Sequence, residues 1–340
     1  MPGRKNGWKE NRIMENILVT GATGFTGTAL CRRLAAEGNT VNAFVRESSQ
    51  TKELEKIGVR CIVVDLTDPE SVLNGFDNFD KVFHIAAAYR TEHSTTDEFT
   101  AVNVEATRNL LEAAKVKGIK RFIHCSTVGV QGEIDDPPAA EDYRFKPGDH
   151  YQQSKLEGEL LALEYAAQGL PVVVFRPVGI YGPGDTRFLK LFKSVAKGVF
   201  LMIGSGKVLY HMTYIDDLVD GIILCGTVDG INGEVFTLGG EKYTTLKELV
   251  AEIADVLGKP YPKLRIPFLP VYWASIICDK VCKMINVSPP IYPRRVEFFS
   301  KDRAFSIEKA KQKLGYQPKV SLREGLARTA DWYRSNGYLP

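Results

Sequence analysis

Apolar positions follow two different rhythms in the first half of the chain. Short unbroken apolar runs alternate with longer stretches in which apolar residues recur every three or four positions. The runs are typical of strands buried on both faces, and the longer repeat is typical of helices that cover a sheet. We predict strands at about 16–20, 40–45, 60–64, 80–86, 121–126 and 171–176. We predict helices at 25–37, 50–57, 69–75, about 96–117 and 151–168.

This alternation predicts an α/β fold with a doubly wound parallel sheet over residues 14–180. Residues 1–13 are polar and basic and lack the apolar run of a signal peptide. We therefore predict that they form a disordered extension.

The second half, 181–340, is less regular and proline-rich, and we expect it to form mainly a smaller, discontinuous C-terminal lobe. The β-forming run Val235–Leu238 is expected to return to the first sheet, so that about 207–240 belongs to the sheet domain. Isolated helices are predicted at 186–197, 244–257 and 321–335.

The longest apolar region, 266–287, is interrupted by prolines and by three charged residues, which excludes an ordinary membrane span. Four large side chains in it share one helical face. We expect this face to pack against the C-terminal lobe; a lid over an apolar substrate and a contact with a membrane surface are the alternatives. The four are Trp273, Ile277, Val281 and Met284.

Composition narrows the class of protein. The chain has 340 residues, 44% of them hydrophobic, and a net charge of +3, which is too small to make nucleic acid or an anionic membrane the expected partner. Its six cysteines include no C-x-x-C pair, so we expect reduced thiols in a cytoplasmic protein, with no disulfide framework and no metal site.

Glycines follow the first strand at positions 21, 24 and 27. In a strand–turn–helix, Gly21 permits the tight turn, Gly24 lets the backbone approach a pyrophosphate, and Gly27 lets the helix pack close to the strand. The spacing predicts a Rossmann-type dinucleotide site, with Thr23 and Phe25 in the same turn; a purely steric glycine turn is the alternative.

The second strand ends just before Arg46, where an NAD-binding fold usually places an acid against the adenosine ribose. An arginine there favours a ribose phosphate, with help from Ser48 or Ser49. We therefore expect NADP(H) in preference to NAD(H), with NAD(H) possible. The alternative is an ordinary solvated arginine.

The third and fourth strands end in further candidate cofactor contacts. Asp65 is placed to accept from the adenine amino group while Leu66 packs on the ring, although Asp65 is also a candidate helix cap before Pro69. The small side chains of Ala86, Ala87 and Ala88 leave room for a dinucleotide. His84 has no acid nearby in sequence and is expected to be a satisfied buried residue.

Tyr151 and Lys155 lie four residues apart and therefore on one face of a predicted helix. A phenol with a reference pKa near 10 needs about three units of depression to act as a base near neutrality, and a neighbouring ammonium helps to supply it. The fifth strand ends in Ser126 and Thr127, whose hydroxyls are candidates to hold a substrate oxygen.

Seven motifs in this order resemble the extended short-chain dehydrogenase/reductases, the NAD-dependent epimerase/dehydratase group. The resemblance covers about Asn16 to the C-terminus, including Lys313-Leu314-Gly315-Tyr316-x-Pro318 near its end. The motifs are Thr20-Gly21-x-x-Gly24-x-x-Gly27, Asp65-Leu66, Ala86-Ala87, Asn103-Val104, Ser126-Thr127, Tyr151-x-x-x-Lys155 and Arg176-Pro177.

The resemblance implies roles for individual residues. Tyr151 would be the acid/base, Lys155 would lower its pKa and bind the nicotinamide ribose, and Thr127 or Ser126 would orient the substrate oxygen. Asn103 would support the site. The resemblance also implies a homodimer formed by the helices at 96–117 and 151–168, and it places Asp217 at the return to the second lobe. Residues expected to line the nicotinamide are Pro177, Val178 and Ile180.

Two departures from the family pattern narrow the range of reactions that we expect this chain to catalyse. Val128-Gly129 follows the active hydroxyl where sugar dehydratases carry an acidic pair, and Tyr210 stands where nucleotide-sugar epimerases place a diphosphate-binding arginine. Candidate substitutes for that cation are Arg187, Arg294 and Arg295. Aromatic and aliphatic residues dominate the expected substrate lobe, which suits a less polar molecule.

We therefore predict an oxidoreductase of the reductase and hydroxysteroid-dehydrogenase-like branch. It would transfer hydride between a nicotinamide cofactor and a secondary alcohol or ketone. A nucleotide-sugar epimerase that uses the same tyrosine is the alternative. A non-catalytic dinucleotide sensor is the third possibility.

Overall fold

A single parallel sheet forms the centre of the computed structural model, which describes residues 14–88, 95–285 and 287–339. The predicted extension 1–13 lies outside these residues. The seven strands have the spatial order β11-β6-β5-β4-β1-β2-β3. Their bounds are β1 Asn16–Thr20, β2 Thr40–Val45, β3 Arg60–Val63, β4 Lys81–His84, β5 Arg121–Cys125, β6 Val172–Pro177 and β11 Val235–Leu238.

Helices cover both faces of the sheet because successive strand residues point to opposite sides. Ile17 and Val19 pack into one hydrophobic cluster with α1 (Phe25–Ala36) and α8 (Ile215–Thr227). Leu18, between them, packs into the other cluster, with α3, α5 and α6. This arrangement confirms the doubly wound fold. The bounds are α2 Lys52–Lys56, α3 Pro69–Gly75, α5 Ala106–Lys117 and α6 His150–Ala167.

The helix predicted at 96–117 contains a wider turn. It consists of α4 (Thr96–Thr100), one π-helical segment (Ala101–Glu105) and α5. Gly158 of α6 packs against this segment so closely that a β-carbon at Gly158 would overlap the carbonyl oxygen of Asn103. The π turn and the glycine together bring α6 against the helix that carries Asn103.

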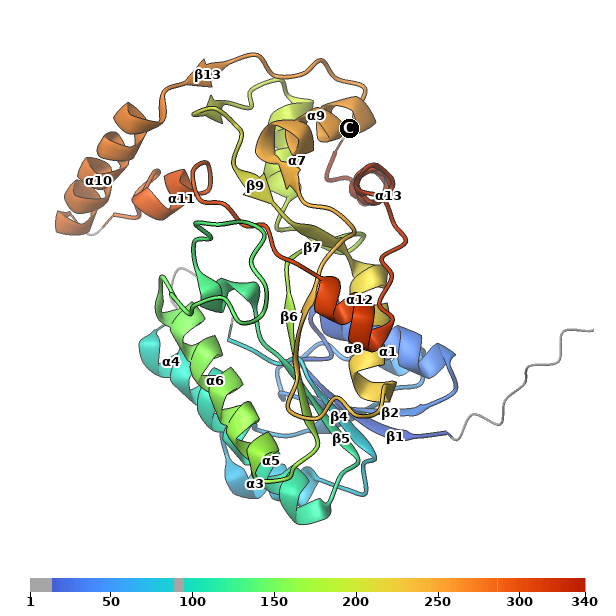
Figure 1. Ribbon diagram of the computed structural model, residues 1–340. Coiled ribbons are helices and arrows are strands. Elements are labelled where there is room, and N and C mark those ends of the chain that lie inside the picture. Colours follow the sequence, from blue (N-terminus) through green and yellow to red (C-terminus); the bar gives the residue numbers. More distant parts are fainter. Residues whose placement is uncertain (1–13, 89–94, 286, 340) are drawn as a thin grey trace, which may run out of the picture.

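The C-terminal half adds short strand pairs and helices above the carboxyl edge of the sheet (Figure 1). β11 pairs in parallel with β6, as the sequence predicts, whereas the domain boundaries stay predictions. The pairs are β7 (Gly179–Tyr181) with β10 (Met212–Tyr214), β8 (Met202–Ile203) with β13 (Arg265–Ile266), and β9 (Leu209–Tyr210) with β12 (Thr244–Thr245). The helices are α7 Leu189–Ala196, α9 Leu246–Val256, α10 Phe268–Met284, α11 Pro293–Glu297, α12 Glu308–Leu314 and α13 Leu322–Ser335.

Helix α10 projects from the lobe (Figure 1). Its predicted packing face is exposed, so the expectation that this face packs against the lobe is wrong: the exposed residues include Trp273, Ile277, Val281 and Met284. Within the described ranges, no helix combines the length and the apolar character that crossing a membrane requires.

Candidate active site

The glycine turn after β1 has the close backbone contacts that its spacing predicts. Gly21 has φ +69°, and a β-carbon there would lie 2.6 Å from the backbone nitrogen of Ala86. A β-carbon at Gly27 would overlap the Gly21 carbonyl oxygen. Gly24 is the N-cap of α1 and has no side chain to satisfy the first amide groups of that helix. The turn therefore offers backbone donors to an anion.

A cavity of about 1220 Å³ runs from this turn across the carboxyl ends of the strands to the C-terminal lobe. Every predicted site residue lines it, although their individual roles stay predictions. The predicted catalytic residues are Ser126, Thr127, Tyr151 and Lys155. The predicted cofactor contacts are Gly21, Thr23, Gly24, Phe25, Arg46, Asp65, Leu66, Ala86, Ala87, Ala88, Lys155, Pro177, Val178 and Ile180.

His84 is buried behind the glycine turn and has a hydrogen-bond partner for each ring nitrogen, as the sequence predicts. It joins β1 to α5. Its Nδ1 lies 2.7 Å from Thr20 Oγ1 and its Nε2 lies 2.9 Å from Thr107 Oγ1. Thr107 donates its own proton to the Asn103 carbonyl, so it accepts from Nε2, and we infer the Nε2–H tautomer. Burial lowers the pKa of His84 to about 3, and the Lys155 charge adds to the effect. The imidazole is therefore neutral at pH 7.

Asn103 connects the floor of the cavity to the helix that carries Tyr151. Its Oδ1 accepts from the backbone nitrogen of Ala88 at 2.8 Å, and its Nδ2 donates to Ser154 Oγ at 2.9 Å. Ser154 in turn donates to the carbonyl oxygen of Tyr151. Asn103 is therefore placed as the support that the resemblance implies.

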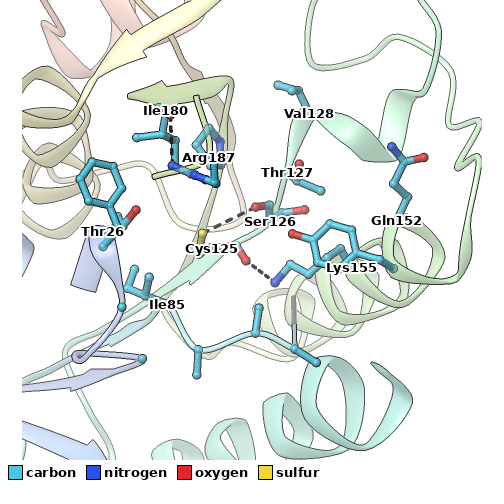
Figure 2. A pocket seen from close by; sticks show the side chains of 18 of the residues that line it. Thr26, Ile85, Cys125, Ser126, Thr127, Val128, Gln152, Lys155, Ile180 and Arg187 are labelled. Carbon is cyan, nitrogen blue, oxygen red and sulfur yellow. Dashed lines mark hydrogen bonds between the residues drawn. The ribbon is translucent and has the colours of Figure 1, made fainter. Parts of the chain in front are cut away.

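Lys155 is buried at the base of the cavity. Its Nζ donates to the carbonyl oxygen of Cys125 at 2.5 Å (Figure 2). Burial lowers the pKa of the ammonium. Tyr151, one turn earlier on α6, lines the same cavity, and its ring meets Phe99 edge-on with centroids 6.0 Å apart. The structure thus brings the phenol and the ammonium to one cavity.

The two candidate hydroxyls at the end of β5 differ in their partners. Ser126 donates to the buried Glu159 carboxylate at 2.5 Å, and that carboxylate also binds Arg176. Thr127 Oγ1 accepts from the Gly129 backbone nitrogen at 3.1 Å, which leaves its proton available to donate. This difference favours Thr127 as the substrate-binding hydroxyl.

Arg46 and Asp65, the predicted adenosine contacts, both line the cavity beyond the carboxyl ends of β2 and β3. The Arg46 backbone donates to Ser49 Oγ at 3.1 Å, and both residues line the cavity with the Arg46 side chain exposed. Asp65 accepts from the side chain and backbone of Thr67, which lowers the pKa of its carboxyl. The cap of α3 is Asp68, so the alternative role of Asp65 as a helix cap is wrong.

Sequence reasoning missed Arg303 as a cation of this cavity. Its Nη1 donates to the Tyr210 hydroxyl at 2.8 Å, and its guanidinium lies 5.4 Å from the centre of that ring. Within the described residues Arg303 has no carboxylate partner. The segment around 303 is irregular, so no periodicity or motif pointed to it; only its backbone bridge to Tyr210 brings it there.

The three cations proposed from sequence have different positions. Arg187 lines the cavity but is held by Asp185 at 2.6 Å and by the Ile180 carbonyl at 3.1 Å (Figure 2). Arg295 donates to the Pro290 carbonyl and is not among the residues that line the cavity. The Arg294 side chain lies outside the described part of the structure. Of the guanidinium groups that the described residues place in this cavity, Arg187 is ion-paired, whereas Arg46 and Arg303 are not, and Arg303 is the one beside Tyr210.

Characterised proteins resemble the chain over most of its length. The 2-alkyl-3-oxoalkanoate reductase of Stenotrophomonas maltophilia is 31% identical and covers 92% of this chain and 97% of the relative. The 3 beta-hydroxysteroid dehydrogenase/Delta 5-->4-isomerase of Mycobacterium tuberculosis is 30% identical, with 94% and 90% covered.

Solved structures share the architecture. The UDP-glucuronic acid 4-epimerase of Bacillus cereus, solved in complex with NAD, is 26% identical and has a TM-score of 0.74. The match covers 94% of this chain and 99% of that one. The model of the NAD dependent epimerase/dehydratase family matches residues 17–239. The chain therefore belongs to that family, as an enzyme of the extended short-chain dehydrogenase/reductase class.

Proposed function

We propose that the protein is an NADP(H)-preferring oxidoreductase that interconverts a secondary alcohol and a ketone. The observation that carries the proposal is one continuous cavity, which joins the glycine turn at Gly21 to Thr127, Tyr151 and Lys155 and then to an apolar end. The apolar end includes Met212, Phe298 and Phe305.

The cavity fits a nicotinamide dinucleotide. A β-carbon at Gly21 would overlap the backbone of Ala86, so the tight turn requires a glycine there, and Gly24 leaves the first amide groups of α1 open to a pyrophosphate. Arg46 and Ser49 are the residues that would hold a ribose phosphate. The bound nicotinamide supplies the hydride.

The side chains around Lys155 position the substrate and move its proton. Thr127 donates a hydrogen bond to the substrate oxygen, and Tyr151 exchanges its phenolic proton with that oxygen as the carbonyl and the alcohol interconvert. The Lys155 ammonium, fixed by the Cys125 carbonyl, stabilises the phenolate that remains when Tyr151 has given up its proton.

Arg303 suggests what kind of ketone the site takes. An unpaired guanidinium beside apolar walls suits a substrate with an apolar body and one anionic group, because the anion is then paired by a charge-assisted hydrogen bond. A relative named 2-alkyl-3-oxoalkanoate reductase supports this substrate class, since an oxoalkanoate carries a ketone, an alkyl chain and a carboxylate.

A nucleotide-sugar epimerase is the second candidate. The likeness to the UDP-glucuronic acid 4-epimerase favours it, and Arg303 would then serve a diphosphate. This enzyme would use the same Tyr151 but would show no net redox change.

We further propose a cytoplasmic homodimer. The six free cysteines suit a reducing compartment. The outer faces of α5 and α6 carry the exposed apolar residues Val116 and Leu160, which suit a helix-to-helix contact between two copies. A monomeric mass in solution would exclude the dimer.

The proposed reaction is tested with purified protein. NADPH consumption is followed with 3-oxoalkanoates, uncharged ketones of equal chain length, and oxidised steroids, and UDP-sugars are tested for epimerisation. Oxidation of exchangeable NADPH by an oxoalkanoate supports the proposal. Tightly held cofactor with UDP-sugar turnover and no net redox would replace it with the epimerase. Arg303→Gln should raise KM for the carboxylate substrate but not for the uncharged ketone.

A further inference from the structure

Helix α10 and the loop that follows it present an apolar surface that no described part of the chain covers. Trp273 and Ile277 are each 62% exposed, and Met284 is 84% exposed. Single exposed apolar residues are ordinary, but a cluster on one projecting element indicates a contact surface. The remaining members of this apolar face are Leu269, Val281, Ile285 and Val287.

The part of the chain that includes α10 and its flanking segments is strongly basic. Residues 259–295 contain seven lysines and arginines and one acid, Asp279, a net charge of +6, whereas the whole chain carries +3. Asp279 is already paired with Lys283. Lys263, Arg265 and Lys280 are exposed and have no ion pair within the part of the chain that the structure describes.

Lys280 lies on the same side of α10 as the apolar residues, because it is seven residues after Trp273 and four before Met284. A long lysine side chain at such a position buries its methylenes and keeps its ammonium in water. This arrangement suits the boundary between acyl chains and phosphate headgroups more than a dry protein interface, which would leave the ammonium without a partner.

We propose that α10 lies in the surface of an anionic phospholipid bilayer, with its apolar face among the acyl chains and the surrounding cations against the headgroups. The helix has 17 residues and no described helix can span a bilayer, so it binds parallel to the surface. The positive charge of 259–295 is complementary to anionic lipid, and this complementarity distinguishes a membrane from an uncharged apolar partner.

The membrane contact also has a consequence for the substrate, and this step rests on the proposed function. The chain runs from α10 into α11, and Pro293, Glu297 and Phe298 line the cavity. Docking of α10 therefore brings the apolar end of the cavity close to the bilayer. An amphiphilic ketone with one anionic group would then reach the cavity from the membrane.

The test is sedimentation with sucrose-loaded vesicles of 70% phosphatidylcholine and 30% phosphatidylglycerol, compared with pure phosphatidylcholine, at low and high salt. We expect the wild type to partition at least tenfold more strongly onto the anionic vesicles and to lose this preference at high salt. Trp273→Ser with Ile277→Ser, and separately Lys263→Glu with Lys280→Glu, should each reduce partitioning at least tenfold.

The matched control is Val63→Ser with Val199→Ser, which removes two similarly exposed apolar residues elsewhere and should leave partitioning unchanged. Tyr151→Phe should bind vesicles like the wild type, so loss of the proposed reaction and loss of membrane binding are separable. Equal sedimentation of wild type and α10 variants would overturn the proposal. A lower oligomer mass in the α10 variants, without any change in partitioning, would overturn it in favour of a contact between two copies.

Discussion

The Glu159 carboxylate and the Arg176 guanidinium form a two-point ion pair inside the protein, with Oε1 2.5 Å from Nη2 and Oε2 3.0 Å from Nε. Both side chains are almost fully buried. Ser126 donates to the same carboxylate, and Arg176 Nη1 donates to the Glu141 carbonyl at 2.8 Å. The pair therefore links α6 to strands β5 and β6 directly behind the candidate active site.

Glu159→Ala should be strongly destabilising, because it leaves a buried guanidinium without its counter-ion. We expect a loss of about 3–5 kcal/mol in the free energy of unfolding. Urea unfolding, with the slope checked for two-state behaviour, measures it. Glu53→Ala, which breaks the exposed Glu53–Lys56 pair, is the control and should leave the midpoint unchanged. Equal effects of the two substitutions would contradict the structural role of Glu159.

Tyr151→Phe should remove most turnover and leave cofactor affinity intact, because it deletes the proton donor and keeps the ring against Phe99. We expect a fall in kcat of about 10²–10⁴. Steady-state kinetics and cofactor binding isotherms measure the two quantities. Tyr165→Phe removes another hydroxyl of α6, one that donates to Glu112 outside the cavity, and should keep full turnover. Normal turnover in Tyr151→Phe would eliminate the proposed mechanism.

Arg46→Asp should reverse the cofactor preference. It removes the guanidinium that would bind the ribose phosphate of NADP and supplies a carboxylate that would bind the ribose of NAD. We expect NADP affinity to fall by about tenfold to a hundredfold and NAD affinity to rise. Isotherms for both cofactors measure it. Arg60→Asp makes the same change at the amino end of β3, away from the cavity, and should alter neither affinity. If NADP affinity were the same with and without Arg46, the residue would have no role in binding the cofactor phosphate.

Stability should fall as the pH drops from 7.5 to 5.5. Burial lowers the pKa of His84 to about 3, against an ordinary value of 6.5, and lowers that of His124 as well. Below pH 6.5 the unfolded chain therefore binds protons that the folded protein does not. The free energy of unfolding then falls by about 1.4 kcal/mol per pH unit for each such histidine. A hydrogen bond from Thr67 lowers the pKa of Asp65, and one from Lys120 lowers the pKa of Asp80. These two carboxyl groups change the free energy of unfolding only below about pH 4.

Urea unfolding at several pH values checks this slope. His84→Gln should make the slope shallower, whereas His150→Gln, at an exposed position on α6, should not change it. A free energy of unfolding that is constant between pH 7.5 and 5.5 would contradict the assignment of neutral buried imidazoles.

The sequence predicted the features that depend on local spacing. The glycine turn follows from three glycines in seven residues, and the shared location of Tyr151 and Lys155 follows from their separation by one helical turn. The first strand was predicted with its observed bounds, and so was β11. These are short-range consequences of backbone geometry and hydrophobic pattern.

Features that depend on distant contacts were not predictable in the same way. Nothing near Ser126 in the sequence indicates that its hydroxyl donates to Glu159. The sequence therefore left open whether Ser126 or Thr127 binds the substrate oxygen. Arg303 lies 93 residues after Tyr210, in an irregular segment, and meets it only in the folded chain. The pattern around Trp273 identified the residues of one helical face, but whether a face is covered depends on what else packs there.

The absence of a side chain at Gly158 sets how closely α6, the helix of Tyr151, approaches the π-helical segment that contains Asn103. A single methyl group there would overlap the Asn103 carbonyl and force α6 outward, and the phenol of Tyr151 would move with it. Since a shift of about 1 Å can lower a rate by about 10²-fold, Gly158→Ala should give a folded but slow enzyme. In the proposed mechanism, the span between hydride donor and proton donor would thus depend on a hydrogen atom that lies two turns further along the same face of α6.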